Sequence, residues 1–135
     1  MKKPWIPIAI SLACVSHAFA QTPQQFIAEF AEEAQQSSTP FRGFDAQRGE
    51  QFFTEPHGGE WSCSSCHTSN PAAMGKHIVT GKPIDPLAPG ANPERFTNPA
   101  KVDKWFRRNC KDVLKRECTP QEKGDVLTYL LSVAR

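Results

Sequence analysis

The spacing of apolar and helix-capping residues predicts four helices along this chain. The first begins at Thr22, with Pro23 at its first position and Gln25 placed to complete a capping box. It ends in the segment 37–40, Ser-Ser-Thr-Pro, which we interpret as a linker. Its apolar residues recur every three or four positions and therefore share one face: Phe26, Ile27, Phe30, Ala31 and Ala34.

The three other helices are predicted in the remainder of the chain. One begins at Asp45 and runs to residue 52 or 53, and Gly49 within it would let another helix cross closely. Another begins at Asn98-Pro99 and runs to about residue 109. The last is opened by a second capping box over residues 119–122. It is expected to bury four apolar residues: Val126, Leu127, Leu130 and Leu131.

Residues 68–97 form a long stretch that is rich in proline and glycine and has no helical periodicity. Few strand signals appear anywhere in the chain, so the pattern predicts an all-α protein with one extended loop. A structureless loop of this length is unusual in a small domain unless something other than side chains supplies its core.

The segment 63–67 explains what that core is. Cys63 and Cys66 are separated by two residues and followed at once by His67, which is the pattern of c-type haem attachment. Each thiol bonds one vinyl group of the porphyrin, and the histidine supplies an axial nitrogen. The chain has neither a second C-x-x-C nor zinc-finger histidine spacing, and the flanks lack a thioredoxin-like strand and helix. We therefore predict one covalently bound haem c, around which the loop folds.

The first twenty residues are typical of an export signal. Lys2 and Lys3 precede a short apolar run over 6–15, and Ala-Phe-Ala at 18–20 is a small-residue cleavage site. A lipoprotein signal ending at Cys14 is the alternative, although Ser11 stands where that pattern favours Leu. We predict cleavage after Ala20 and a periplasmic protein, with a helix and linker over 21–40 and a haem domain over 41–135.

Removing the signal leaves 14 basic and 14 acidic residues, so the mature chain has no net charge. A domain-wide basic surface for nucleic acid is therefore absent from the sequence. Export to an oxidising compartment lets Cys110 and Cys118 form a disulfide. Its short loop corresponds to a stabilisation of roughly 2–3 kcal/mol.

Several residues compete for the sixth position of the iron. Met74 is the only methionine left after signal removal, but it follows His67 by seven residues, which leaves little chain to reach the opposite face of the haem. His57 and His77 would give a bis-histidine site, although a solvated or propionate-side role suits both. Each of the three therefore has a structural alternative to iron ligation.

Asn109 is a fourth candidate. Val102, Trp105, Phe106 and Asn109 fall at helical spacing, so a single amide ends an apolar stripe. A buried amide needs a polar partner, and iron would be one. Asn109 follows His67 by 42 residues, far enough for the chain to cross to the distal side. The alternative is an asparagine that only caps the helix end. Trp105 and Phe106 are expected to form the pocket wall.

The region from about residue 45 onward resembles the sphaeroides haem protein family, which consists of monohaem, class I-like cytochromes c. The resemblance is dense from Cys63 and weaker over the N-terminal helix. It rests on these segments: Thr80-Gly81-Lys82, Pro86-Leu87-Ala88-Pro89, Arg95-Phe96-Thr97, Lys104-Trp105, Arg108-Asn109-Cys110, Cys118-Thr119-Pro120 and Glu122-Lys123. It implies a cytochrome c-like fold, His67 and Asn109 as the iron ligands, and a Cys110–Cys118 disulfide.

The resemblance also implies a function. An amide binds ferrous iron more weakly than ferric iron, so reduction would release Asn109 and open a site for O2, NO or another diatomic gas. The family is linked to nitric oxide dioxygenation, and a multihaem cytochrome c and a membrane cytochrome b are its implied redox partners. The alternative is a monomeric electron-transfer cytochrome that docks partners beside the haem through basic residues near residues 101–116. The sequence does not distinguish a gas binder from a catalyst.

Overall fold

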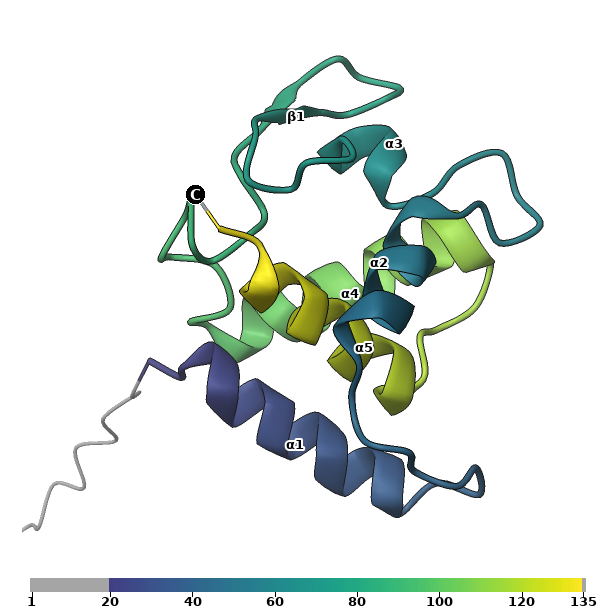
Figure 1. The fold of residues 1–135 in the computed structure, drawn as a ribbon. Helices are drawn as coiled ribbons and strands as arrows, with labels where there is room; N and C mark the ends of the chain where they lie inside the picture. The colour runs from purple at the N-terminus through teal and green to yellow at the C-terminus, as the bar shows by residue number, and fades with distance from the viewer. Residues whose placement is uncertain (1–19, 135) are drawn as a thin grey trace, which may run out of the picture.

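The computed structural model describes residues 20–134, so nearly all of the predicted signal peptide lies outside the described residues. Five helices and one small two-stranded sheet follow one another along this part of the chain (Figure 1). The elements are α1 (Pro23–Gln35), α2 (Ala46–Thr54), α3 (Ser64–His67), β1 (Gly75–Lys76), β2 (Pro83–Ile84), α4 (Pro99–Leu114) and α5 (Pro120–Ser132).

The four long helices begin at the capping residues that were predicted from the sequence. Thr22 and Thr119 each form a complete capping box, in which the threonine side chain accepts a backbone N–H and the third residue of the helix reciprocates. Asp45 caps α2 through the N–H of Arg48, and Asn98 caps α4 through the N–H of Lys101. All four predicted helices are thus confirmed at their N-terminal ends.

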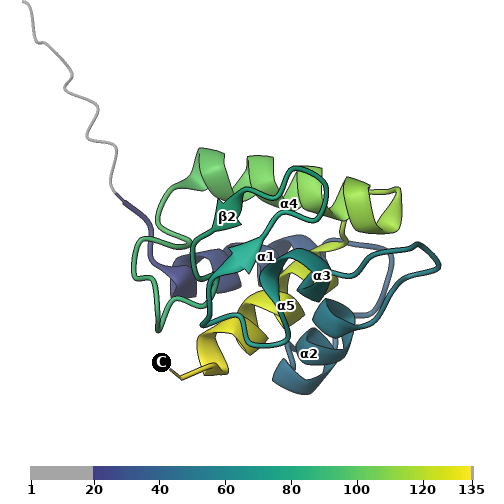
Figure 2. The ribbon, with the colours of Figure 1, turned by 90° about the horizontal axis from the view of Figure 1, so that it is seen from above.

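Helix α5 lies at the centre of the fold, between α2 and α4 (Figure 2). The predicted close crossing at Gly49 is confirmed, because a Cβ there would stand 2.0 Å from the backbone oxygen of Asp125. The Asp125 carboxylate at this crossing is buried and accepts Arg48 Nη2 at 2.8 Å and the backbone N–H of Asp45 at 2.8 Å. A buried carboxylate needs such donors, so this network fixes α2 on α5.

Two groups of apolar side chains form the core. One joins Phe26 and Phe30 of α1 to Val102 and Leu127, and the other joins Phe53 of α2 to three residues of α5, Val126, Tyr129 and Leu130. Half-buried Phe96 packs against both groups. Leu131, which was expected to be buried, is only half-buried at the edge of the first group. No helix among residues 20–134 is long and apolar enough to cross a membrane.

Three elements differ from the predicted set. Helix α3 and the hairpin of β1 and β2 were not expected, because a four-residue helix and two-residue strands leave no periodicity to recognise. Helix α4 runs five residues beyond the predicted end, to Leu114. Val113 is buried in this last turn, and Lys115 ends the helix in the left-handed conformation that glycine usually supplies.

Candidate haem site

The attachment motif folds as the single turn of α3, which lies at the top of the molecule beside β1 (Figure 1). His67 is the last residue of this turn, and its backbone N–H bonds to the Cys63 carbonyl at 3.1 Å. The turn stops at Thr68, whose φ is 63°. Cys63 and Cys66 are both free thiols. They are therefore not joined as a redox disulfide, and both remain available for thioether bonds.

Ser62 stabilises the start of this turn. Its backbone N–H donates to Ser65 Oγ at 3.0 Å, and its carbonyl accepts the Ser65 N–H at 3.2 Å. Ser62 is buried whereas Ser65 is exposed, so these bonds are partly shielded from water. Residues without haem chemistry of their own thus hold the two cysteines in one turn.

The His67 ring is half-buried, and its centroid lies 6.3 Å from the centroid of the Phe53 ring. Burial and, to a smaller extent, the nearby charge of Arg95 lower the pKa of His67 to about 4. The imidazole is therefore neutral at physiological pH, which is the form that binds a metal. Burial also raises the pKa of the Cys63 thiol to about 11.

The hairpin of β1 and β2 packs directly on the motif. A Cβ at Gly75 would stand 2.4 Å from the Cys66 carbonyl oxygen and 3.1 Å from the His67 Cα. Farther along, the Ile78 N–H donates to Cys66 Sγ at 3.5 Å. Gly75 was not singled out from the sequence, because a close backbone approach leaves no local sequence signal.

The proline-rich loop is tied down by backbone bonds rather than by helices. Leu87 and Ala88 donate their N–H groups to the Pro71 carbonyl at 2.8 and 2.9 Å. Arg95 donates from Nε to the Pro86 carbonyl at 2.9 Å and from Nη2 to the Asp85 carbonyl at 2.8 Å. The sequence interpretation noted Arg95 only within the family resemblance, whereas the structure gives it a role in fixing this loop near His67.

The alternative ligands have other contacts in this structure. His57 Nε2 lies 2.7 Å from the Phe52 carbonyl, at the end of α2, and its ring packs on Phe52. His77 Nδ1 accepts the N–H groups of Val79 and Thr80 at 3.3 and 3.1 Å, so it organises the hairpin loop. Met74 is 53% exposed and directly precedes Gly75, whose backbone touches the motif.

The predicted apolar stripe on α4 is only partly buried. Val102 is buried and Phe106 is half-buried, whereas Asn109 is exposed and Trp105 is 44% exposed. The buried line instead continues through Cys110 and Val113. The protein core therefore covers only part of the stripe, and the roles of Trp105, Phe106 and Asn109 at the haem stay predictions. Helical geometry explains the difference, since Trp105 and Asn109 lie on one flank of the line that contacts the core.

That flank of α4 faces the segment leading into the haem motif. A surface pocket of about 170 Å³ is lined by Asp112 and Lys115 on one side and by residues 59–61 on the other. A Cβ at Gly59 would stand 3.2 Å from the Val113 carbonyl oxygen. Asn109 lies one turn before Asp112, and residues three apart on a helix share a face. The Asn109 side of α4 is therefore directed toward the chain that enters Ser62 and Cys63.

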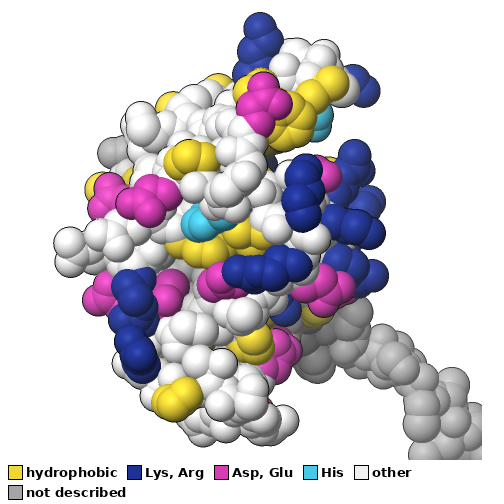
Figure 3. Space-filling view, turned by 90° about the vertical axis from the view of Figure 1, so that its right-hand side faces the viewer, with side chains coloured by type: hydrophobic (Ala, Val, Ile, Leu, Met, Phe, Trp, Pro, Cys, Tyr) yellow, Lys and Arg dark blue, Asp and Glu magenta, His cyan; other side chains and the backbone are white. Residues whose placement is uncertain are grey.

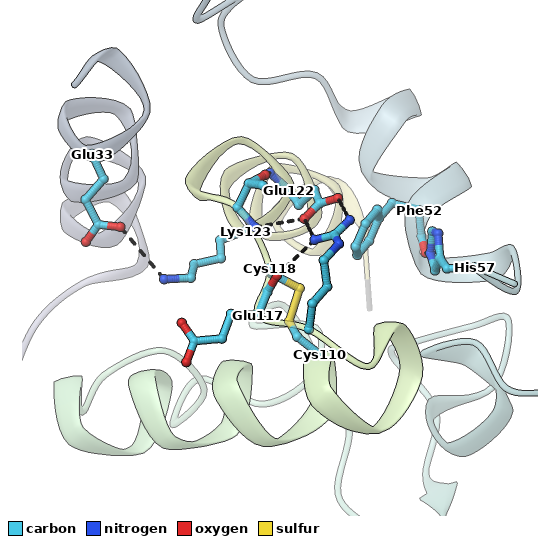
Figure 4. Close-up of a disulfide and its surroundings, with 10 residues drawn as sticks. Glu33, Phe52, His57, Cys110, Glu117, Cys118, Glu122 and Lys123 are labelled. Atoms are coloured by element: carbon cyan, nitrogen blue, oxygen red, sulfur yellow. Dashed lines mark hydrogen bonds and ion pairs between the residues drawn. A yellow bond between two sulfur atoms is a disulfide. The ribbon is translucent and has the colours of Figure 1, made fainter. Parts of the chain in front are cut away.

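A disulfide fixes this end of α4. Cys110, next to Asn109, is bonded to Cys118 with a Cα–Cα distance of 5.5 Å. Figure 4 shows the bridge joining α4 to the start of α5, with Glu122 above it. Glu122 pairs with Arg116 Nη2 at 2.7 Å. The helix end that carries Asn109 is thus held by a covalent bond and by an ion pair.

The residues fit a haem c. The hairpin exposes Ile78 and Val79, which are 47% and 68% exposed, and α4 exposes Trp105. Figure 3 shows a hollow between the segment at the top of the view and a row of Lys and Arg side chains at its right. Two free thiols, a neutral, half-buried imidazole and exposed apolar side chains are the groups that a covalently attached porphyrin requires. Among residues 20–134, no cluster of three or more His, Cys, Asp or Glu side chains is arranged to hold a metal ion alone.

Comparison with known proteins identifies relatives of the chain. A family described as "Domain of unknown function (DUF1924)" matches residues 39–130. Cytochrome c'' of Methylophilus methylotrophus is 51% identical over 80 residues, which cover 59% of this chain and 56% of that protein. The match thus spans a little over half the length of that relative. The cytochrome c-type protein SHP of Cereibacter sphaeroides is 46% identical over 90 residues, covering 64% of this chain and 69% of that protein.

Solved structures agree with these sequence matches. Oxidised cytochrome c'' from Methylophilus methylotrophus superposes with a TM-score of 0.73 at 38% identity, covering 84% of this chain and 95% of the other. Oxidised SHP, described as an oxygen-binding cytochrome c, superposes with a TM-score of 0.72 at 41% identity, covering 82% and 96%. The fold is therefore the small all-α cytochrome c fold, as predicted. The chain belongs to the sphaeroides haem protein family of c-type cytochromes, together with cytochrome c'' and SHP.

Proposed function

We propose that this chain is a periplasmic, redox-active monohaem cytochrome in which Asn109 is the distal ligand of the oxidised protein and leaves on reduction, so that a diatomic gas binds. The observation that carries this proposal is the position of Asn109. It lies beside the Cys110–Cys118 disulfide, on the flank of α4 that faces the segment entering the haem motif. The description of SHP as an oxygen-binding cytochrome c supports gas binding in the family.

The two proposed iron ligands have different roles: His67 stays bound, whereas Asn109 leaves on reduction. When bound, haem supplies an iron that changes between two oxidation states and can take a gas as its sixth ligand. His67, which is half-buried and neutral, would supply the proximal nitrogen. Asn109 offers a neutral amide oxygen, which is a weak ligand, and once released its N–H can donate a hydrogen bond to a gas molecule. The disulfide keeps the amide close to the site after release.

Haem attachment, export, the redox partners and an enzymatic activity are further parts of this proposal, and the family resemblance supports them. Cys63 and Cys66 attach a single haem, and the signal peptide is removed after Ala20. A multihaem cytochrome c and a membrane cytochrome b are the redox partners, and nitric oxide dioxygenation is the enzymatic activity to be tested. That activity requires no separate acid–base pair, so repeated rather than stoichiometric nitric oxide consumption in the presence of a reductant distinguishes a catalyst from a binder.

Optical spectra of the haem-loaded protein with and without carbon monoxide test the role of Asn109. The wild type should become high-spin on reduction and shift with carbon monoxide. Asn109→Ala should remove the sixth ligand, so its oxidised spectrum should already be high-spin and should bind added anionic ligands at least tenfold faster.

Met74→Leu is the matched control, because Met74 is the only methionine in the mature chain and is 53% exposed. Its spectra should equal those of the wild type. An Asn109→Ala spectrum identical to wild type in the oxidised state would exclude Asn109 as the ligand. A carbon monoxide-insensitive, low-spin reduced wild type would instead support the second candidate, a simple electron-transfer cytochrome, which the basic residues of α4 favour.

A further inference from the structure

The outer surface of α4 carries a concentration of positive charge that the haem chemistry does not use. The helix contains five basic residues against two acidic ones, and all five are exposed: Lys101, Lys104, Arg107, Arg108 and Lys111. The rest of the mature chain has nine basic and twelve acidic residues. The mature chain therefore has no net charge, but α4 carries a net positive charge and the remainder carries a net negative charge.

Most of this charge is not neutralised within the molecule. Arg107 pairs with Asp103 one turn away, but among residues 20–134 none of the other four cations of α4 lies within ion-pair distance of a carboxylate. By contrast, the basic side chains of Arg48, Arg116 and Lys123, elsewhere in the chain, each pair with an acidic residue. A charged face that is left unpaired contributes to association with a charged partner rather than to folding.

An aromatic side chain lies within the charged face. Trp105 is 44% exposed, with Lys104 Nζ 5.4 Å and Arg108 Cζ 5.6 Å from its ring centroid. Cation–π contact of this kind keeps both cations beside the ring. Tryptophan and arginine are the residue types that contribute most to protein interfaces. Because Trp105 is also one of the apolar side chains assigned to the haem site, the docking surface is the cationic rim that Lys104 and Arg108 form beside its ring.

The charged face also borders the haem site. Trp105 lies on the same flank of α4 as Asn109, one helical turn away. Figure 3 shows Lys and Arg side chains both at the right of the hollow and on the segment above it. The upper segment is the hairpin, whose Lys76 and Lys82 are exposed. Cations therefore lie on two sides of this hollow, which is the proposed entrance to the haem site.

Negative charge is concentrated elsewhere. Helix α1 contains Glu29, Glu32 and Glu33 and no basic residue, and it lies at the opposite end of the molecule from the hairpin (Figure 1). Although α1 packs beside α4, the end of the molecule that carries the hairpin is cationic and the α1 end is acidic. This separation would turn the haem entrance toward an approaching anionic surface. A partner with an acidic surface would be attracted by the entrance and repelled by α1.

We propose that the outer face of α4, together with Lys76 and Lys82 of the hairpin, is the docking surface for a redox protein whose own cofactor is exposed within an acidic surface. The inference rests on the redox activity proposed above, but it does not depend on release of Asn109. Docking there places the partner's cofactor beside the haem entrance, and it holds the partner by charge rather than by a large apolar contact. Such a complex is transient and sensitive to salt.

Charge reversal on α4 tests the proposal with haem-loaded protein and a reduced, strongly acidic [2Fe–2S] ferredoxin as the probe. Stopped-flow reduction of the wild type should be fast at low salt and slow down as salt is added. Arg108→Glu should lower the second-order rate constant several-fold, and Lys104→Glu with Arg108→Glu should lower it about tenfold or more at low ionic strength. At high ionic strength the three proteins should converge.

Arg42→Glu is the matched control, because it makes the same change of charge at an exposed residue outside α4 and the hairpin. It should lower the rate constant less than Arg108→Glu does. Equal effects of the two variants would overturn the proposal, since only net charge would then matter. Reduced and oxidised optical spectra equal to those of the wild type establish that the variants retain their haem site, whatever the spectra say of Asn109.

A second readout does not depend on electron transfer. Nuclear magnetic resonance spectra of the haem-loaded protein titrated with oxidised ferredoxin should show shifts at the amides of α4, with none on α1. Shifts confined to other elements would overturn the proposal. Binding to anionic phospholipid vesicles that equals or exceeds binding to ferredoxin would likewise overturn it, by assigning the charged face to a membrane surface.

Discussion

At the scale of single residues, the haem motif depends on neighbours that carry no haem chemistry. Ser62 forms hydrogen bonds with Ser65 through its backbone and its hydroxyl and so holds the turn in which both cysteines lie. Gly75 permits the hairpin to contact the backbone of Cys66 and His67. Arg95 fixes the proline-rich loop through two backbone carbonyls and lies near enough to His67 to affect its pKa. The positions of the ligands are therefore set by hydrogen bonds and by close packing of backbone.

The close contact at Gly75 predicts that a single added methyl group there destabilises the protein. Gly75→Ala places a Cβ 2.4 Å from the Cys66 carbonyl oxygen, and backbone atoms on both sides leave no flexible group to yield. We expect the free energy of unfolding to fall by about 2–3 kcal/mol and the yield of haem-loaded protein to fall with it. Thermal unfolding followed at the haem absorbance band measures the first effect, and haem absorbance per protein measures the second.

Gly43→Ala is the control that distinguishes the effect of steric crowding from the effect of backbone strain. Gly43 has a φ of +74° and no atom within 4 Å of the added Cβ, so Gly43→Ala meets strain alone. It should cost about 1 kcal/mol and leave the haem yield unchanged. The interpretation of Gly75 fails if Gly75→Ala is no more harmful than Gly43→Ala.

At the scale of elements, the join between α4 and α5 fixes the helix that carries Asn109. The disulfide closes the short loop covalently, and the Glu122 side chain accepts from Arg116 Nη1 at 2.8 Å and Nη2 at 2.7 Å. Glu122 also accepts the backbone N–H of Thr119 at 2.8 Å, as the third residue of its capping box. One carboxylate thus starts α5 and holds the loop that follows α4.

This carboxylate makes the stability of the join depend on pH. Burial alone would raise the pKa of Glu122, but hydrogen bonds from Arg116 and Thr119 outweigh burial and hold the pKa below its ordinary value of 4.5. A carboxyl group whose pKa is lowered by folding stabilises the protein fully above its unfolded pKa. That stabilisation is lost as the pH falls through the lower folded pKa. Glu122→Gln should therefore cost about 1 kcal/mol at pH 7 and progressively less below about pH 4.5.

Urea unfolding of the two proteins between pH 3 and pH 7 measures this difference. Glu117→Gln is the control, because Glu117 is exposed and its side chain points away from the ion pair (Figure 4). It should stay close to wild type at every pH. A cost for Glu122→Gln that stayed constant with pH would mean that lost packing, and not lost charge, is responsible.

The same elements show how far the sequence alone determines the fold and the site. Capping boxes at Thr22 and Thr119 are local patterns, and both predicted their helices correctly. The hairpin was missed because its strands are two residues long and are held by contact with α3, which no local pattern records. The end of α4 was missed because Lys115 adopts a conformation that normally signals glycine. The partial exposure of Trp105 could not be predicted, because periodicity identifies a helix face but not how much of that face the core covers.

At the scale of the whole molecule, α1 belongs to the same core as the haem domain although it precedes the region that matches the family. The ring of Phe30 packs edge-on against Phe106 of α4, with ring centroids 5.6 Å apart. The centroid of the Phe26 ring lies 6.3 Å from that of Phe30. The sequence boundary at residue 40 therefore marks a linker between two parts of one core. α1 supports α4 from the side opposite to the haem motif.

That support can be measured at Phe30, which is 5% exposed. Phe30→Ala removes a buried ring between α1 and α4 and should lower the free energy of unfolding by about 3–4 kcal/mol in denaturant unfolding of the haem-loaded protein. Glu32→Ala, on the exposed side of the same helix, should change it by less than about 0.5 kcal/mol. If α1 were only an appendage, the two variants would unfold at the same denaturant concentration as the wild type. If instead α1 is part of the core, only Phe30→Ala will shift the unfolding of the haem domain itself, because the ring it loses is one that α4 packs against.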